Sequence, residues 1–170
     1  MLSVLKKSNK ERELASRLHA AIIGRARAPE FFARFGVPDT LDGRFDLVVL
    51  HSWLALGRLR EPALHEVSQR LTNMMFSAFD EGLRELGISD MGMGRRMKKI
   101  ANAFYGRFKA YDEAADEAAM ADALLRNLYR GKEEHSDAAA TLAGYVFSAK
   151  DALAHSNAAQ GELDFGPLPQ

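Results

Sequence analysis

The sequence contains no cysteine, and this absence excludes several kinds of chemistry. Without thiols the chain cannot form a disulfide framework, use a cysteine nucleophile or build a zinc site on thiolates. Any catalysis would have to come from carboxylates, histidines, lysines or hydroxyl groups.

Long apolar runs and net charge are missing as well. No apolar run approaches the roughly 20 residues that cross a bilayer, and the first ten residues lack the features of a secretory signal. The 23 Lys and Arg residues balance 23 Asp and Glu residues, so the net charge of zero gives no bulk preference for nucleic acid or anionic lipid. The sequence predicts a chain that is soluble or, at most, peripheral to a membrane.

Turn-forming residues are few, with 5 prolines and 13 glycines in 170 residues. Between them lie stretches of roughly 15 to 25 residues rich in good helix formers. We therefore predict an all-α, single-domain bundle of about six to seven helices. The expected helices cover residues 10–27, 29–35, 40–60, 62–86, 94–130 and 137–155. The stretch 94–130 is expected to break between Tyr111 and Asp122, one continuous helix being the alternative, and residues 160–170 are expected to form a loose tail.

The segment 40–60 is apolar on nearly every side. Its large apolar residues are Phe45, Leu47, Val48, Val49, Leu50, Trp53, Leu54, Leu56 and Leu59. A helix with this pattern belongs at the centre of a bundle. Asp39 and Thr40 are candidate N-caps for it, and Trp53 is expected in the core rather than at an interface.

His51 interrupts this apolar segment and lies seven residues from both Arg44 and Arg58. We interpret the three as a polar stripe that meets solvent or a buried carboxylate such as Asp46. An enzyme built on the stripe is a weaker hypothesis, because no second catalytic group is visible. The five histidines include no pair three or four residues apart, so neither a metal site nor a cofactor is expected.

The glycine-containing stretch from Met91 to Arg96 resembles a phosphate-binding loop only superficially. No predicted strand precedes it, and no Lys-Ser or Lys-Thr pair ends it. We interpret it as a flexible connector between two helices.

Basic residues follow this stretch without interruption by acids. Six lie between Met91 and Ala110, namely Arg95, Arg96, Lys98, Lys99, Arg107 and Lys109. On a helical wheel most of them lie opposite an apolar stripe that includes Phe104 and Phe108. Arginines in the first turn of a helix oppose its dipole. The face is either solvated and neutralised by later acids, or it attracts a phosphate backbone, an anionic membrane or an acidic protein.

The zero net charge is a cancellation between two parts of the chain. Residues 1–110 carry 19 basic and 12 acidic side chains, a balance of +7. Residues 111–170 carry 4 basic and 11 acidic side chains, a balance of −7. Bulk neutrality therefore does not argue against a charged partner.

Two motifs resemble the ubiquinol-cytochrome c chaperone family. The first is GVPDTLDGRFDLVVLH at residues 36–51, and the second is LGISDMGMGRRMKK at residues 86–99, which continues through 103–107 and 111–112. The resemblance covers about residues 10–130. It implies an all-α, non-enzymatic factor for assembly of the cytochrome bc1 complex that acts on newly made cytochrome b. Mitochondrial members carry an N-terminal extension, work with a small partner protein and associate with the ribosome, so this chain resembles the bacterial form.

These observations predict a partner-binding surface on the basic helix. Its residues are Arg95, Arg96, Lys98, Lys99, Tyr105 and Lys109, with Arg44 and His51 as weaker candidates. The expected partner is cytochrome b or another bc1 subunit, with the ribosome or an anionic membrane surface as further candidates and no DNA. The expected location is cytoplasmic, or peripheral at the inner membrane. The alternative is an RNA- or ribosome-binding helical module without chaperone activity. Two observations count against it: the domain is neutral overall, and it contains no recognised nucleic-acid motif.

Overall fold

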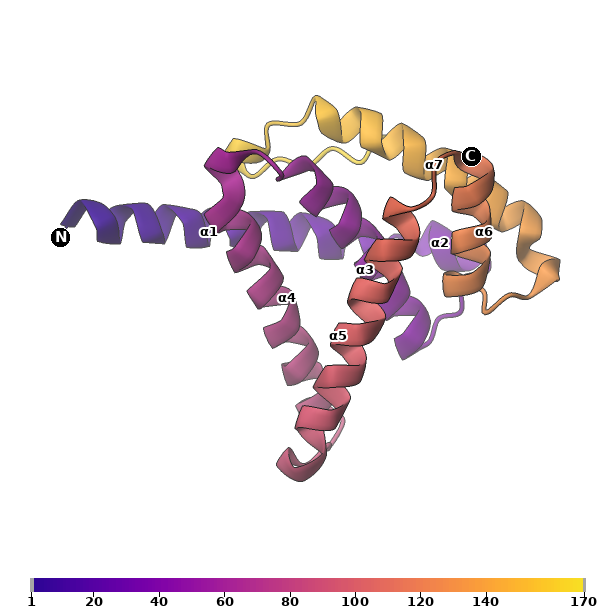
Figure 1. The fold of residues 1–170 in the computed structure, drawn as a ribbon, viewed down its shortest axis with the longest axis horizontal. Helices are drawn as coiled ribbons and strands as arrows, with labels where there is room; N and C mark the ends of the chain where they lie inside the picture. Colours follow the sequence, from indigo (N-terminus) through magenta and orange to yellow (C-terminus); the bar gives the residue numbers. More distant parts are fainter. Residues whose placement is uncertain (1, 170) are drawn as a thin grey trace.

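The computed structural model describes residues 2–169, with side chains described from residue 6 onward. Within that range all regular elements are helical (Figure 1). The α-helices are α1 (Leu2–Ala26), α2 (Pro29–Ala33), α3 (Leu41–Arg58), α4 (His65–Glu85), α5 (Asp90–Asp112), α6 (Glu117–Leu128) and α7 (Ser136–Ala154). Two short 3-10 helices, η1 (Pro62–Leu64) and η2 (Glu133–His135), lie in connections, and a third, η3 (Ala158–Gln160), follows α7. The all-α prediction is confirmed. No helix in the described part of the chain is both long and apolar enough to cross a bilayer.

Helix α3 lies at the centre, as its apolar circumference predicts. It contacts α1, α5, α6 and α7, and Leu47, Leu50 and Ala55 on it are fully buried. The Thr40 hydroxyl caps the helix by accepting a hydrogen bond from the Gly43 N–H at 3.2 Å. Trp53, 4% exposed, lies in the core as predicted.

Helix α1 begins at Leu2, so the predicted start at Lys10 is wrong. No glycine precedes Gly24 to interrupt it. An ion pair between Lys7 and Glu11, one turn apart with N and O at 3.9 Å, supports its early turns. Helix α1 packs along both α3 and α4.

Helices α4 and α5 form a hairpin that projects from the rest of the molecule, with the connecting turn at its tip (Figure 1). Gly87, with φ of 79°, follows the end of α4, close to the predicted end of this helix at residue 86. Helix α5 already begins at Asp90, however, and Gly92 and Gly94 lie inside it. The interpretation of this stretch as a flexible connector is therefore wrong. The acidic Asp90 in the first turn suits the helix dipole and offsets part of the cost of the glycines.

The predicted break after Tyr111 is confirmed. Helix α5 ends at Asp112, and the Asp116 carboxylate then caps α6 by accepting a hydrogen bond from the Ala119 N–H at 2.8 Å. Because a capped helix starts with unpaired N–H groups, this side chain sets where α6 begins.

The C-terminal segment is not the loose tail that we predicted. Phe165 is only 5% exposed, and its ring centroid lies 5.4 Å from that of His51. The Arg25 guanidinium donates a hydrogen bond to the Gly166 carbonyl at 2.8 Å. These contacts hold the segment against the helices at positions more than a hundred residues away in sequence.

Candidate interaction surface on helix α5

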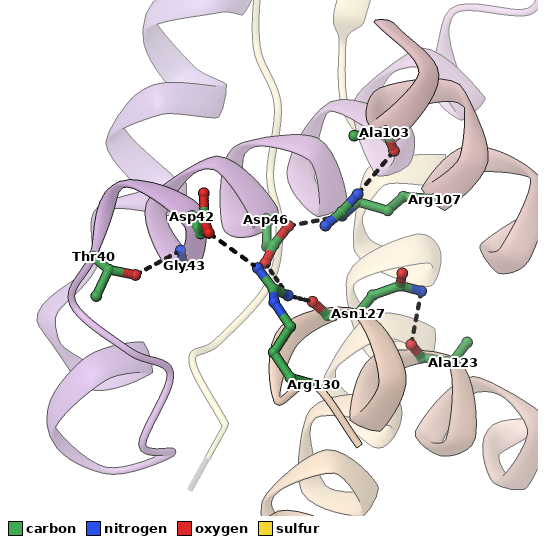
Figure 2. Close-up of polar contacts among 9 residues, drawn as sticks. All are labelled: Thr40, Asp42, Gly43, Asp46, Ala103, Arg107, Ala123, Asn127 and Arg130. Atoms are coloured by element: carbon green, nitrogen blue, oxygen red, sulfur yellow. Dashed lines mark hydrogen bonds and ion pairs between the residues drawn. The ribbon is translucent and has the colours of Figure 1, made fainter. Parts of the chain in front are cut away.

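The base of α5 is fixed to the centre of the bundle by a buried carboxylate. Asp46 on α3 is 0% exposed and forms ion pairs with Arg107 of α5 and Arg130, which follows α6, each at 2.7 Å (Figure 2). Removal from water raises the pKa of Asp46 above its ordinary value, and the two guanidinium groups oppose that rise. One side chain thus joins three helical segments.

The local sequence around Asp46 explains part of the first motif. A Cβ on Gly43 would lie 1.9 Å from the Pro38 carbonyl oxygen, so only glycine permits this close approach of the backbone. Together with the Thr40 cap, this approach fixes the start of α3 and hence the position of Asp46 one turn later. The motif residues Thr40, Gly43 and Asp46 therefore build structure rather than a binding surface.

The inward side of α5 is held by aromatic packing. Phe104 is fully buried, and its ring stacks on that of Phe108 with centroids 4.4 Å apart. Phe76 of α4 packs against Phe104 at 5.2 Å. Such pairs stabilise by more than their buried area alone. This packing fixes which side of α5 faces outward.

An arginine links the two helices of the hairpin near its tip. Arg84 near the end of α4 pairs with Asp80 at 2.8 Å and with Asp90 in the first turn of α5 at 2.5 Å. Two acids of the hairpin are thereby engaged within it, whereas Glu85 beside the turn is exposed and forms no ion pair among the described residues.

The outward side of α5 brings most of the predicted site residues together. Arg95, Arg96, Lys98, Lys99 and Lys109 are exposed, and Tyr105 is 55% exposed. We call these six residues the α5 basic face. At 3.6 residues per turn all except Arg96 lie within a sector of about 120°. Among the described residues, Arg95, Arg96, Lys98 and Lys99 form no ion pair, whereas Lys109 lies 3.7 Å from Glu113.

Two features of the face differ from the sequence interpretation. Arg107 is not part of it, because its guanidinium is turned inward to Asp46. Since α5 begins at Asp90, Arg95 and Arg96 lie in its second turn, and the unfavourable dipole interaction is weaker than a start at Gly94 would give.

Arg44 and His51 do not join the α5 basic face. Arg44 is exposed on the first turn of α3 and pairs with Asp39 at 2.7 Å. His51 is 0% exposed, so its assignment to a polar stripe that meets solvent is wrong. Arg58, the third member of that stripe, pairs instead with Glu61 at 2.6 Å.

His51 belongs to a buried hydrogen-bond network. Its Nδ1–H donates to the Leu47 carbonyl at 2.7 Å, which leaves Nε2 to accept from the Tyr145 hydroxyl at 2.9 Å. Arg25 Nε donates to the same hydroxyl at 2.9 Å. Burial lowers the pKa of His51 to about 4, so the ring is neutral near pH 7. Phe31 and Phe165 enclose it, and this packing describes a structural histidine rather than a catalytic one.

A small cavity, which no sequence pattern predicts, lies beside Trp53. Its volume is about 260 Å³, and its lining includes Asp112 and Lys150. The Trp53 indole N–H donates to Asp112 at 2.9 Å, and the Lys150 ammonium lies 4.8 Å from the centroid of the indole ring. The Trp53–Asp112 bond is a second tie between α3 and the base of α5. Within the described residues, no group of three potential ligand side chains is placed to hold a metal ion.

Fold and site together define a single-domain helical bundle with an exposed basic helix face. Residues 33–160 match the family model described as ubiquinol-cytochrome C chaperone. The chain therefore belongs to this family.

Relatives of known name agree with the family match. The chain is 25% identical over 162 residues to ubiquinol-cytochrome c reductase complex assembly factor 1 of Mus musculus, covering 91% of this chain and 55% of the mouse protein. It is 28% identical over 118 residues to the factor of the same name from Xenopus laevis, covering 67% of this chain and 59% of that protein. The chain thus spans little more than half the length of these relatives.

A solved structure covers nearly the whole chain. The crystal structure of the Cbp3 homolog from Brucella abortus is 37% identical in sequence and superposes with a TM-score of 0.83. The match covers 97% of this chain and 98% of the Brucella chain. This similarity confirms the predicted all-α fold.

Proposed function

We propose that this protein is an assembly chaperone for the cytochrome bc1 complex that binds newly made cytochrome b at the membrane surface and catalyses no reaction. The observation that carries the proposal is the α5 basic face, presented by a chain of the ubiquinol-cytochrome c chaperone family. The mouse and Xenopus relatives are named as assembly factors of the ubiquinol-cytochrome c reductase complex, which supports the same role.

The chemistry of the proposed contact is electrostatic steering. Arg95, Lys98 and Lys99 project into solvent without ion-pair partners among the described residues, so they can attract an anionic surface at low cost. Tyr105 adds a ring that is half exposed and carries a polar hydroxyl, a type of side chain common at interfaces. The ion pairs at Asp46 hold the base of α5, so the face is presented in a fixed orientation. We place this activity at the inner membrane, with the protein held peripherally.

Charge reversal on the face tests the proposal. Replacing Arg95, Arg96, Lys98 and Lys99 together by glutamate should abolish most bc1 assembly in the native host, measured as assembled complex on native gels. The matched control replaces Arg12, Arg27, Arg126 and Lys132 by glutamate. These four are exposed and form no ion pair within the described residues, and their reversal changes the net charge by the same amount.

The comparison of the two variants decides the outcome. Normal assembly with a stably folded face variant would overturn the proposal, and equal defects in both variants would show that total charge rather than this face matters. Circular dichroism and urea denaturation of both purified variants separate loss of binding from loss of folding.

The α5 basic face also supports a second candidate, an RNA- or ribosome-binding module without chaperone activity. The run without acids between Met91 and Ala110 is the observation in its favour. Phosphate contacts release counterions, so this function requires RNA binding that weakens steeply with salt. Absence of RNA affinity at low salt would exclude it.

A further inference from the structure

A single line of exposed residues runs along the whole outward side of α5. Spacings of three and four residues place Met91, Arg95, Lys98, Asn102, Tyr105 and Lys109 on this line, and all six are exposed. At 1.5 Å per residue the line is about 27 Å long. Between Met91 and Ala110 no acidic residue interrupts it.

The line ends in apolar side chains at the tip of the hairpin. Met91 is 99% exposed, and Leu86 in the adjoining turn is 57% exposed. Large exposed apolar groups beside cations are typical of surfaces that rest in the headgroup region of a bilayer, where the chains of lysine and arginine extend to phosphates and apolar tips enter the acyl boundary. A phosphate backbone of RNA would use the cations but would leave Met91 and Leu86 without a partner.

The acids of the hairpin lie beside the line of exposed residues on α5 rather than on it. Arg84 pairs with both Asp80 and Asp90 and offsets half of their charge, while Glu81 and Glu85, which is exposed beside the turn, lie on α4, the other arm of the hairpin. Residues 65–110 still carry 8 basic and 5 acidic side chains, a balance of +3. The net charge of −7 belongs to residues 111–170, which form α6, α7 and the segments around them. These helices lie at the end of the molecule opposite the tip (Figure 1). A negative surface would therefore attract the hairpin and repel the opposite end, which orients the protein.

We propose that α5 docks on acidic phospholipid headgroups through the α5 basic face, with Met91 and Leu86 entering the interface as apolar anchors. The inference rests on the proposed function for its location at a membrane, and it names the chemistry that this surface meets there. The occupant that this inference assigns to the face is the lipid surface at which the proposed function places the newly made client.

Vesicle binding by the full chain tests the inference. The probes are vesicles of phosphatidylcholine alone and vesicles in which about a third of the lipid is phosphatidylglycerol. At low ionic strength we expect at least tenfold tighter binding to the acidic vesicles. Reversal of Arg95, Arg96, Lys98 and Lys99 to glutamate should remove this preference, and the control reversal of Arg12, Arg27, Arg126 and Lys132 should retain it.

The apolar anchors have a separate readout. Replacing Met91 and Leu86 by serine leaves every charge in place and should weaken binding to acidic vesicles several-fold. In a Met91→Trp variant, the added indole should shift its emission to the blue when acidic vesicles are added. Trp53 is buried, and a Leu41→Trp variant, at another exposed apolar position, should show no shift.

Each outcome separates the lipid inference from the proposed function. Equal binding to both kinds of vesicle, or binding to single-stranded RNA or an acidic peptide in place of acidic vesicles, would overturn the inference. If charge reversal blocks bc1 assembly but the wild-type chain shows no preference for acidic vesicles, the proposed function stands and the lipid inference fails. If the face binds acidic vesicles but its reversal leaves assembly normal, the inference stands and the proposed role of the face fails.

Discussion

The two helices of the α4–α5 hairpin bury a much smaller share of their residues than the helices of the central bundle. Helix α3 buries ten of its 18 residues and α7 buries seven of its 19, whereas α4 and α5, with 21 and 23 residues, bury three each. Burial of apolar area is the main source of stability. Substitutions in the bundle should therefore cost stability, while the outer half of the hairpin can carry residues chosen for contact with a partner.

The two family-like motifs show the same contrast between buried and exposed residues. In the first, Thr40, Gly43 and Asp46 serve the start of α3 and its ion pairs, and His51 is enclosed in the core. In the second, Arg95 and the neighbouring cations point away from the protein. Packing therefore explains the first motif, whereas it does not explain the exposed cations of the second, which we propose to contact a partner.

The largest loss of stability is expected from a substitution where the hairpin joins the bundle. Asp46→Ala should lower the free energy of unfolding by about 3 kcal/mol, because Arg107 and Arg130 would lose their carboxylate and Arg107 has little access to water. Urea denaturation measures the change. Asp39→Ala is the control, since it breaks an exposed pair with Arg44 and should cost less than about 1 kcal/mol. Equally small losses in both variants would contradict a buried ionic junction.

The second prediction concerns the pH dependence of stability, which we attribute to His51 in the bundle. His51 has a pKa of about 4 in the fold against an ordinary value of 6.5, so the unfolded chain takes up its proton first. The stability from the neutral ring is complete above pH 6.5 and is lost as the pH falls towards 4, up to about 3 kcal/mol in all. His51→Gln does not titrate, so the difference in unfolding free energy between wild type and variant should shrink over this range.

The control for this experiment is His155→Gln, which removes an exposed histidine. Urea denaturation at several pH values between 7 and 4 gives the profiles. A difference between wild type and His51→Gln that stays constant with pH would contradict the burial of a neutral ring.

Local signals in the sequence predict most of the fold. The apolar circumference of α3, the cap at Thr40 and the left-handed Gly87 each depend on residues close in the chain, and the structure confirms them. The basic residues of α5 were also predictable, because helical spacing alone places most of them on one side.

The errors about His51 and the C-terminal segment concern pairs of residues that are distant in sequence. Arg107 and Arg130 meet Asp46 from 61 and 84 positions away, and Tyr145 meets His51 from 94 positions away. Arg25 binds the tail across 141 positions. Neither helical periodicity nor turn rules predict such pairings. His51 was therefore assigned to a stripe that meets solvent or a buried carboxylate such as Asp46, and the tail was expected to be loose.

The smallest change in stability is expected at the tip of the hairpin, where the glycine-containing stretch was predicted to be a connector. Gly94 lies inside α5, and a Cβ there would meet no atom within 4 Å. Gly94→Ala should therefore raise the free energy of unfolding by about 0.5–1 kcal/mol, because alanine loses less backbone entropy in a helix. Gly87→Ala is the matched control in the same hairpin. With φ of 79° it should lower stability by about 1 kcal/mol. If Gly94→Ala gives no gain, the first turns of α5 are not helical in solution, and the line of exposed residues from Met91 to Lys109 loses its N-terminal end.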